Sequence, residues 1–400
     1  MHHPSTQVRR DSEGIVNSIT HQPQVFEEGL EIDCAIRDGL VADMDMYEDL
    51  WTHALDHSFR GVDTKNTPML LAEKVYNSPQ LRQKITELMM EKFQLPGLFM
   101  SRDACLACYA VGKTTGVVVD VGSSGTVISP VADGWVDTKG LNRSLIGGRA
   151  MDAHLLDMLA SKGQKLMPLF RLNKKARLES DPIKETDAVV TWTPRDLKNV
   201  HPTFDAYARL ELARDVKEST SRCAESAVAA DPRLAQLPGT PYELPDGTML
   251  DVGIDRFAGT ELLIDPSPFN AQGAYFKTIT AMPETAAFSP LPAKLDSIPN
   301  LIYNSVLRSD PEIHPQLFGN LIITGGGTAT EGTPERIKYE MEKLVPGVRV
   351  KMMSSLPQER AIGAWLGGSI VASLGSFHEL WISKEEYNDF GSAIVDRKCP

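Results

Sequence analysis

Two short stretches of this 400-residue sequence combine residue types that could bind a phosphate group. The first, VVVDVGSSGTVISPVADG (117–134), places an aspartate and a run of glycine and serine between two apolar segments. This pattern predicts a β-hairpin with an acid and several backbone N–H groups at its bend. The second, LFGNLIITGGG (317–327), is an apolar strand that ends in three glycines ahead of a predicted helix.

Both turns have the composition of a phosphate-binding loop. A phosphate needs converging N–H donors and a close approach of the backbone, which glycine permits because it lacks Cβ. Asp120 could hold Mg²⁺ through water, since hydrated Mg²⁺ is usually bound by one or two carboxylates. A glycine turn after a strand is more often only a turn, so each alone is a weak signal. The predicted donors are Gly122, Ser123, Ser124 and Gly125 at the first turn, and Gly325, Gly326, Gly327 and Thr328 at the second.

Two other motifs do not carry the chemistry that they suggest. Gly112–Lys113–Thr114 looks like the end of a P-loop, but the first glycine of that motif would fall at Ala107. Cys105 and Cys108 have CxxC spacing without a second pair to complete a zinc site, and they lie in an apolar helix pattern. Five cysteines in a long chain are typical of reduced thiols in cytosol or nucleus.

The composition is that of an ordinary globular protein, with 42% hydrophobic and 24% charged residues. No apolar run approaches the roughly 18 residues of a membrane span, and MHHPSTQVRRDSEG lacks the apolar core of a secretory signal. We therefore expect no membrane partner. A net charge of −12 argues against broad or sequence-specific nucleic-acid binding. The basic run at 173–177 is more simply a solvated loop.

Strands alternate with helices along the chain, which predicts an α/β architecture. Two glycine turns about 200 residues apart could face each other as a clasp around a nucleotide. Residues 1–30 are predicted to be a loose lead-in, and residues 164–205 an insertion or flexible loop. The predicted strands lie at 68–73, 98–101, 117–134 and 317–324, with a two-stranded ribbon near 238–254; the predicted helices begin near 43 and cover 78–93, 149–163, 207–230 and 334–344.

The C-terminal stretch WLGGSIVASLGSFHELWISKEEYNDFGSAIVDRKCP (365–400) resembles the end of actin nearly residue for residue. Upstream segments, among them YAVGKTTGVVVDVG and LIITGGG, fall in actin's order, so the resemblance covers most of 30–400. Within the actin superfamily the chain is most similar to the nuclear actin-related protein 4 class. It ends in Cys–Pro, and SPVADG and YELPDGTMLDVGIDRFAGTELLIDPS resemble that class.

This resemblance implies the actin/Hsp70/hexokinase ATPase fold, an α/β fold with two lobes around a nucleotide cleft. The strand–turn–strand that opens actin and carries its first phosphate loop is not found here, so the N-terminal portion of the fold is expected to be missing, as a truncated gene model would explain. The implied subdomains are 31–115 with 362–400 (subdomain 1), 116–163 with 275–361 (subdomain 3) and 164–274 (subdomain 4, with the insertion).

Several site residues depart from actin's. Actin's catalytic glutamine matches Asp103, its catalytic histidine matches Val127, and its ribose-binding aspartate matches Ser123. The adenine-side lysine and glutamate are kept as Lys217 and Glu218, whereas Ala329 and Thr330 replace the residues that bracket adenine. The resemblance thus implies weak or occluded binding of ATP or ADP with Mg²⁺. Hydrolysis should be absent or very slow, because phosphoryl transfer depends on positioning and electrostatics.

The resemblance also implies a groove that binds an amphipathic helix through contacts at i, i+3/i+4 and i+7. Ordinary helix packing is the alternative for its lining. The implied function is a non-catalytic scaffold in nuclear chromatin-remodelling or histone-acetyltransferase complexes. Its partners would be nuclear actin, the HSA-type helix of a remodeller ATPase or acetyltransferase scaffold, and histones. The groove residues are Tyr109, Gly112, Thr114, Val371, Leu374, Ser376 and Leu380.

Two other functions stay open. The first is an ATP-binding, cytoplasmic actin-like filament protein, which the missing phosphate loop, Asp103 and Val127 oppose. The second is a small-molecule kinase of the same ATPase superfamily, which the actin-like C-terminus opposes and for which no sugar-binding residues are evident.

Overall fold

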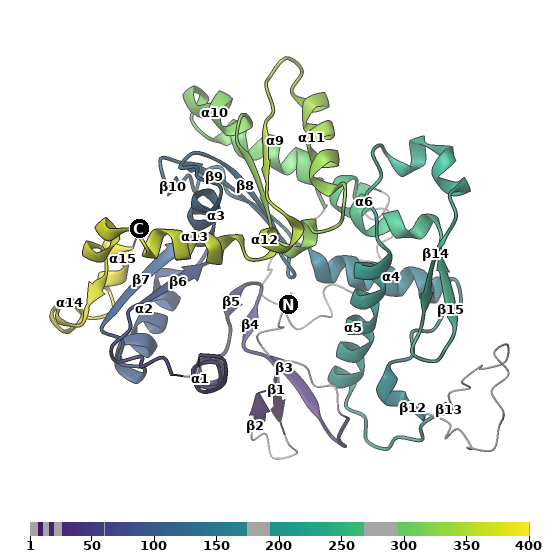
Figure 1. The fold of residues 1–400 in the computed structure, drawn as a ribbon, viewed down its shortest axis with the longest axis horizontal. Coiled ribbons are helices and arrows are strands. Elements are labelled where there is room, and N and C mark those ends of the chain that lie inside the picture. Colours follow the sequence, from purple (N-terminus) through teal and green to yellow (C-terminus); the bar gives the residue numbers. More distant parts are fainter. Residues whose placement is uncertain are drawn as a thin grey trace.

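The computed structural model describes residues 7–10, 16–19, 26–59, 61–173, 193–267 and 295–399. Residues 174–177 of the basic run and 174–192 of the predicted insertion lie outside them. Two sheets with helices packed against them form most of the described fold (Figure 1). Within the described residues no helix is long and apolar enough to cross a membrane. The subdomain boundaries given above stay predictions.

The larger sheet has six strands and contains both glycine turns. Its order is β10-β9-β8-β16-β17, with β11 also paired to β9. The β8–β9 pair is the antiparallel hairpin predicted at 117–134, and β16 runs parallel to β8, so that Thr324 lies opposite Asp120. Its strands are β8 (Gly116–Val121), β9 (Thr126–Ala132), β10 (Trp135–Val136), β11 (Asn142–Ser144), β16 (Leu321–Thr324) and β17 (Met352–Ser354).

Side chains of β8 alternate between two cores, as the period of two in a strand requires. Val117, Val119 and Val121 face the main core with residues of α9 and α11, whereas Val118 packs against Cys105 and Cys108 on the other face. The two thiols are buried, and none of the five cysteines, which all lie in the described residues, forms a disulfide; this confirms the prediction of core thiols. Helices on these faces are α3 (Asp103–Ala110), α9 (Ile298–Arg308), α10 (His314–Phe318) and α11 (Thr333–Leu344).

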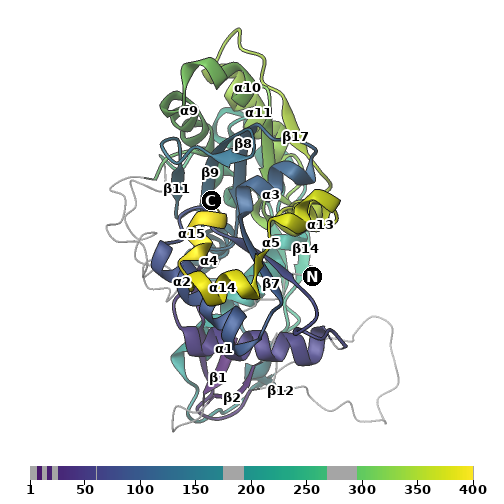
Figure 2. The same ribbon diagram turned by 90° about the vertical axis from the view of Figure 1, so that its left-hand side faces the viewer.

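The smaller sheet, ordered β18-β7-β6, lies beside the C-terminal helices (Figure 2). β6 and β7 run parallel, with Glu73 opposite Arg102. Helix α2 begins where Ser78 accepts a hydrogen bond from the N–H of Leu81 and Pro79 takes the first position. These elements are β6 (Met69–Glu73), β7 (Gly97–Arg102), β18 (Ile382–Ser383), α1 (Met44–His53), α2 (Pro79–Glu87), α14 (Lys384–Phe390) and α15 (Ile394–Lys398).

Helices α13 (Gly363–Ala372) and α3 approach each other so closely that one position requires glycine. A Cβ on Gly367 would lie 1.8 Å from the carbonyl oxygen of Leu106. α13 is preceded by α12 (Pro357–Ala361). This contact fixes the position of the C-terminal elements relative to the larger sheet.

The remaining part of the fold is built on the helix pair α4–α5, with core residues such as Leu155 and Val216. Its ribbon, β14 paired with β15, is the one predicted near 238–254. These and the other elements are α4 (Gly148–Ser161), α5 (Pro202–Thr220), α6 (Ala258–Ile264), β14 (Thr240–Glu243), β15 (Met249–Val252), β12 (Leu172–Asn173), β13 (Thr193–Pro194), β4 (Ile36–Arg37) and β5 (Leu40–Val41).

Two sequence predictions were wrong. The helix expected over 207–230 ends at Thr220, because the N–H of Arg222 donates to Arg256 O and that of Cys223 donates to Glu331 O. Tertiary hydrogen bonds thus replace the next helical turn. The loose lead-in contains β1 (Gln7–Arg10) and β2 (Val16–Ile19), which form an antiparallel sheet with β3 (Glu31–Cys34).

Candidate functional site

Both glycine turns line one cavity of about 440 Å³. The β8–β9 bend contributes to one wall, the turn after β16 to a second, and α5 to a third. Thr328 is fully buried and is not part of the lining. The predicted residues that do line the cavity are Asp120, Gly122, Ser123, Ser124, Lys217, Glu218, Gly325, Gly326 and Gly327.

The β8–β9 bend is held by its own backbone and by the start of α4. The N–H of Gly122 donates to Gly125 O at 2.9 Å, and the N–H groups of Gly148 and Arg149 donate to the carbonyls of Gly122 and Ser123. The Gly122 donor expected to face a phosphate is therefore used inside the bend. Among the predicted donors of this turn, the N–H groups of Ser123 and Ser124 stay candidates.

The second turn is also partly satisfied within the protein. The N–H of Gly325 donates to Arg360 O at 2.9 Å, and the hydroxyl of Thr328 donates to Gly325 O at 2.7 Å. Gly325 has a φ of +89°, and a Cβ there would lie 2.5 Å from an oxygen of Asp120. Gly326 and Gly327 are thus the candidate donors at this turn, and Gly325 is required for the two turns to meet.

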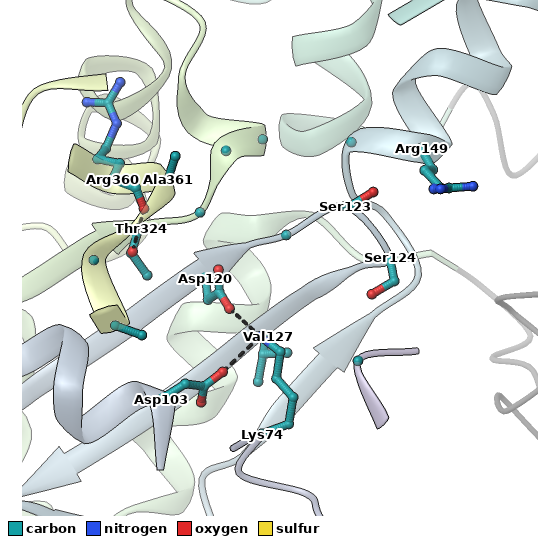
Figure 3. Close-up of a pocket in the computed structure, with 18 of the residues that line it drawn as sticks. Lys74, Asp103, Asp120, Ser123, Ser124, Val127, Arg149, Thr324, Arg360 and Ala361 are labelled. Carbon is teal, nitrogen blue, oxygen red and sulfur yellow. Dashed lines mark hydrogen bonds and ion pairs between the residues drawn. The ribbon is translucent and has the colours of Figure 1, made fainter. Parts of the chain in front are cut away.

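Lys74, which the sequence did not bring forward, lies between the two carboxylates of the cavity (Figure 3). Its Nζ is 2.8 Å from Asp103 Oδ2 and 2.7 Å from Asp120 Oδ2. Burial alone would lower the pKa of Lys74, but attraction to both carboxylates raises it well above its ordinary value. Burial raises the pKa of Asp103, an effect that Lys74 opposes.

Asp103 and Asp120, which line this cavity, are therefore joined by Lys74 in an ion-pair cluster and do not form an open metal site. Hydrated Mg²⁺ is usually bound by one or two carboxylates, and Oδ2 of Asp120 already accepts a hydrogen bond from Lys74. Within the described ranges no group of three or more His, Cys, Asp or Glu side chains is arranged to hold a metal ion. Lys74 therefore lies beside Asp120 where Mg²⁺ was predicted to be held through water, and the residues present do not fit that site.

The two adenine-side residues kept from actin are neutralised by neighbours. Lys217 Nζ lies 2.6 Å from Asp152 Oδ1, and Glu218 accepts a hydrogen bond from Arg214 at 3.0 Å. Burial raises the pKa of Asp152, and Lys217 lowers it in opposition. Both charges are thus engaged within the protein.

The two positions that match actin's catalytic residues lie in this cavity, as predicted from the resemblance. Val127 lines it with an apolar side chain that has no proton to exchange. Asp103 points toward Lys74 (Figure 3), and the resulting ion pair holds its carboxylate away from the role of positioning a water. Ala329 and Thr330 are not part of the lining.

The seven predicted groove residues all line a second cavity, of about 810 Å³, formed by α3, α13 and the segments that follow them. Its rim is apolar and open, with Leu374 52% exposed and Leu380 46% exposed. The sequence missed Ile370, which is 47% exposed and also part of the lining. Its position one residue before Val371 is a signal that could have found it.

Three packed aromatic side chains, Phe99, Phe377 and Trp381, lie under this groove. Phe377 is buried, and its ring lies 5.0 Å from those of Phe99 and Trp381 in edge-to-face contacts. Gly134 makes room for Tyr109, since a Cβ there would lie 2.5 Å from the phenol oxygen. These contacts give the groove a rigid floor beneath exposed leucines.

The fold has the architecture predicted from the resemblance, and comparison with known proteins agrees. Residues 4–400 match the actin family, and the chain belongs to that family. This result confirms the predicted actin-like α/β fold. The chain is 33% identical over 373 residues to actin-related protein 4 of Arabidopsis thaliana, an alignment that covers 93% of this chain and 80% of that protein.

Other relatives carry the same name. Identity is 34% over 373 residues to actin-related protein 4 of Oryza sativa subsp. japonica, covering 93% of this chain and 80% of the relative. It is 29% over 382 residues to the protein of that name in Schizosaccharomyces pombe, covering 93% and 86%. The predicted similarity to the actin-related protein 4 class is therefore confirmed.

Proposed function

We propose that this protein is a non-catalytic scaffold subunit of nuclear chromatin-remodelling or histone-acetyltransferase complexes. Its groove would bind an amphipathic helix of a remodeller ATPase or acetyltransferase scaffold, with nuclear actin and histones as further partners. The observation that carries this proposal is the open apolar groove, in which all seven predicted residues meet. The similarity to proteins named actin-related protein 4 supports the nuclear assignment.

The groove has the chemistry that suits a helix with an apolar stripe. Exposed leucines on the rim and a packed aromatic floor offer separate contacts for side chains spaced at i, i+3/i+4 and i+7. Leu374 is on the rim next to Val371, so both can contact the same helix. Burying one such leucine contributes about 1.5–3 kcal/mol, which makes Leu374 the best single position to test.

The residues of the nucleotide-type cavity support the proposal that this protein does not hydrolyse ATP. Asp103 is ion-paired and Val127 is apolar, so the two positions that match actin's catalytic residues offer neither a neutral amide nor a proton carrier. We infer that hydrolysis is absent or very slow and that nucleotide, where bound, is held weakly. Phosphate release from ATP by the purified protein measures this directly.

The deciding experiment is affinity purification from nuclear extract with the wild type and two variants. Leu374→Asp puts a charge in the groove, and Leu307→Asp puts one at a 50% exposed position of α9, outside the groove. We expect wild type and Leu307→Asp to recover remodeller or acetyltransferase subunits. Recovery with Leu374→Asp should fall about 10- to 100-fold, the factor that corresponds to one buried leucine.

Two outcomes would contradict the proposal. One is recovery of no such subunits by the wild type together with salt-induced polymerisation of the pure protein, which would favour an actin-like filament protein. The other is equal recovery by the two variants, which would place the docking surface elsewhere on the molecule.

A further inference from the structure

A lysine lies at the centre of the nucleotide-type cavity, and three separate elements meet at its charge. Lys74 follows β6, Asp103 begins α3 and Asp120 is the last residue but one of β8. The parallel register of β6 and β7 sets Glu73 opposite Arg102, so the next residues, Lys74 and Asp103, are brought side by side. The ammonium then reaches Asp120 across the boundary between the two sheets (Figure 3).

We propose that the Lys74 ammonium is the resident cation of this cavity and takes the place between Asp103 and Asp120 that a divalent metal ion would occupy. The protein therefore needs no Mg²⁺ to hold its two sheets together at this point. The proposal is independent of the helix-binding groove, which lies on the other side of α3, so failure of one leaves the other standing.

The lysine is held in this position by packing as well as by charge. Gly39 has a φ of +74°, and a Cβ there would lie 3.1 Å from Lys74 Cγ and 2.9 Å from the phenol oxygen of Tyr76. The turn at Gly39 thus covers the aliphatic stem of the lysine. A stem fixed in this way directs the ammonium at the carboxylates without further loss of side-chain freedom.

The charges around the cavity are consistent with a protein-supplied cation. Lys217 pairs with Asp152, and Arg214 pairs with Glu211 and Glu218, so these carboxylates also have a cation from the chain itself. A divalent ion approaching Asp120 would meet the positive charge of Lys74 at close range, which is repulsive. The raised pKa of Lys74 keeps that charge in place throughout the physiological pH range.

The test uses Lys74→Met, which removes the ammonium and keeps an unbranched stem, with Mn²⁺ as the probe metal. For the wild type we expect no Mn²⁺ binding by electron paramagnetic resonance and the same Tm in EDTA as in Mn²⁺. In Lys74→Met the two carboxylates face each other without a cation. Its Tm should fall in EDTA and recover in Mn²⁺, with Mn²⁺ bound at concentrations at least about tenfold below those at which wild type still shows no binding.

Two further variants control the result. Lys74→Met combined with Asp103→Asn leaves Asp120 as the single carboxylate of the pair and should abolish the Mn²⁺ response. Lys338→Met, at an exposed position of α11, should leave the protein indifferent to Mn²⁺. The proposal is overturned if Lys74→Met gains no affinity for Mn²⁺, or if wild type binds Mn²⁺ at a site that Asp120→Asn removes. The comparison of Mn²⁺ binding by wild type and Asp120→Asn tests the proposal even where Lys74→Met does not fold.

Discussion

The close approach of α13 to α3 at Gly367 allows a quantitative prediction about the stability of the protein. An ordinary carbon–oxygen contact is about 3.3 Å, whereas a Cβ on Gly367 would lie 1.8 Å from Leu106 O. The Gly367→Ala substitution must therefore separate α13 from α3 by more than about 1 Å, and a backbone carbonyl has no rotamer by which to move away. Overpacking of this kind costs roughly 3 kcal/mol.

Helix propensity opposes part of that loss. Alanine is better than glycine inside a helix by about 1 kcal/mol, so the net destabilisation by Gly367→Ala should be about 2 kcal/mol. Gly375→Ala is the matched control, because a Cβ there meets nothing within 4 Å and the residue has no positive φ. It should be neutral or stabilising by about 0.5 kcal/mol.

The assay is urea unfolding followed by circular dichroism at constant protein concentration. A gap of about 2 kcal/mol or more between Gly367→Ala and Gly375→Ala is the expected result. Gly368→Ala should lie between them, since its nearest neighbour is the movable Cδ2 of Leu70 at 3.3 Å. Equal stability of Gly367→Ala and the control would refute the close approach of α3 and α13, and with it the shape of the groove between them.

Two further measurements test buried polar groups. Arg82 is 4% exposed and pairs with Glu73 at 2.9 Å and Asp396 at 3.0 Å. Arg82→Met should therefore lower the free energy of unfolding in urea by about 3–5 kcal/mol, whereas Lys84→Met, at an exposed position, should lower it little. Similar losses of stability in the two variants would contradict the buried network. Burial raises the pKa of Tyr76 from 10.0 to about 12, so the folded state keeps a proton that the unfolded state loses. Stability should decline as pH rises from about 10 to 12. Ultraviolet titration of Tyr76→Phe should show one late-titrating tyrosine fewer than wild type, in which the pKa values of Tyr242 and Tyr387 are also raised.

Local patterns were enough to predict the hairpin at 117–134. Both of its strands are apolar and the bend is rich in glycine, so propensity, burial and turn chemistry agree. The helix from 207 was predicted to run to 230, because its local pattern does not record that Arg222 and Cys223 donate their N–H groups to other segments. A boundary set by tertiary hydrogen bonds has no local signal.

Lys74 illustrates the same limit in the candidate site. It is 29 residues before Asp103 and 46 before Asp120, and neither spacing is that of a motif. Its role depends on the parallel register of β6 with β7 and on the contact between two sheets, which a single sequence does not specify. The carboxylates could be predicted from actin's pattern, whereas the cation that joins them could not.

The two proposals assign separate roles to the ion-paired cavity and to the open groove of this actin fold. In the proposal for Lys74, its ion pairs with Asp103 and Asp120 join the two sheets where a metal ion would otherwise do so. Internal pairs act at all ligand concentrations, whereas stabilisation by a ligand follows its concentration. The contact of α3 with α13 at Gly367, which shapes the groove, is likewise made by the chain itself. For the proposed scaffold, both features would therefore be present whether or not a ligand is bound.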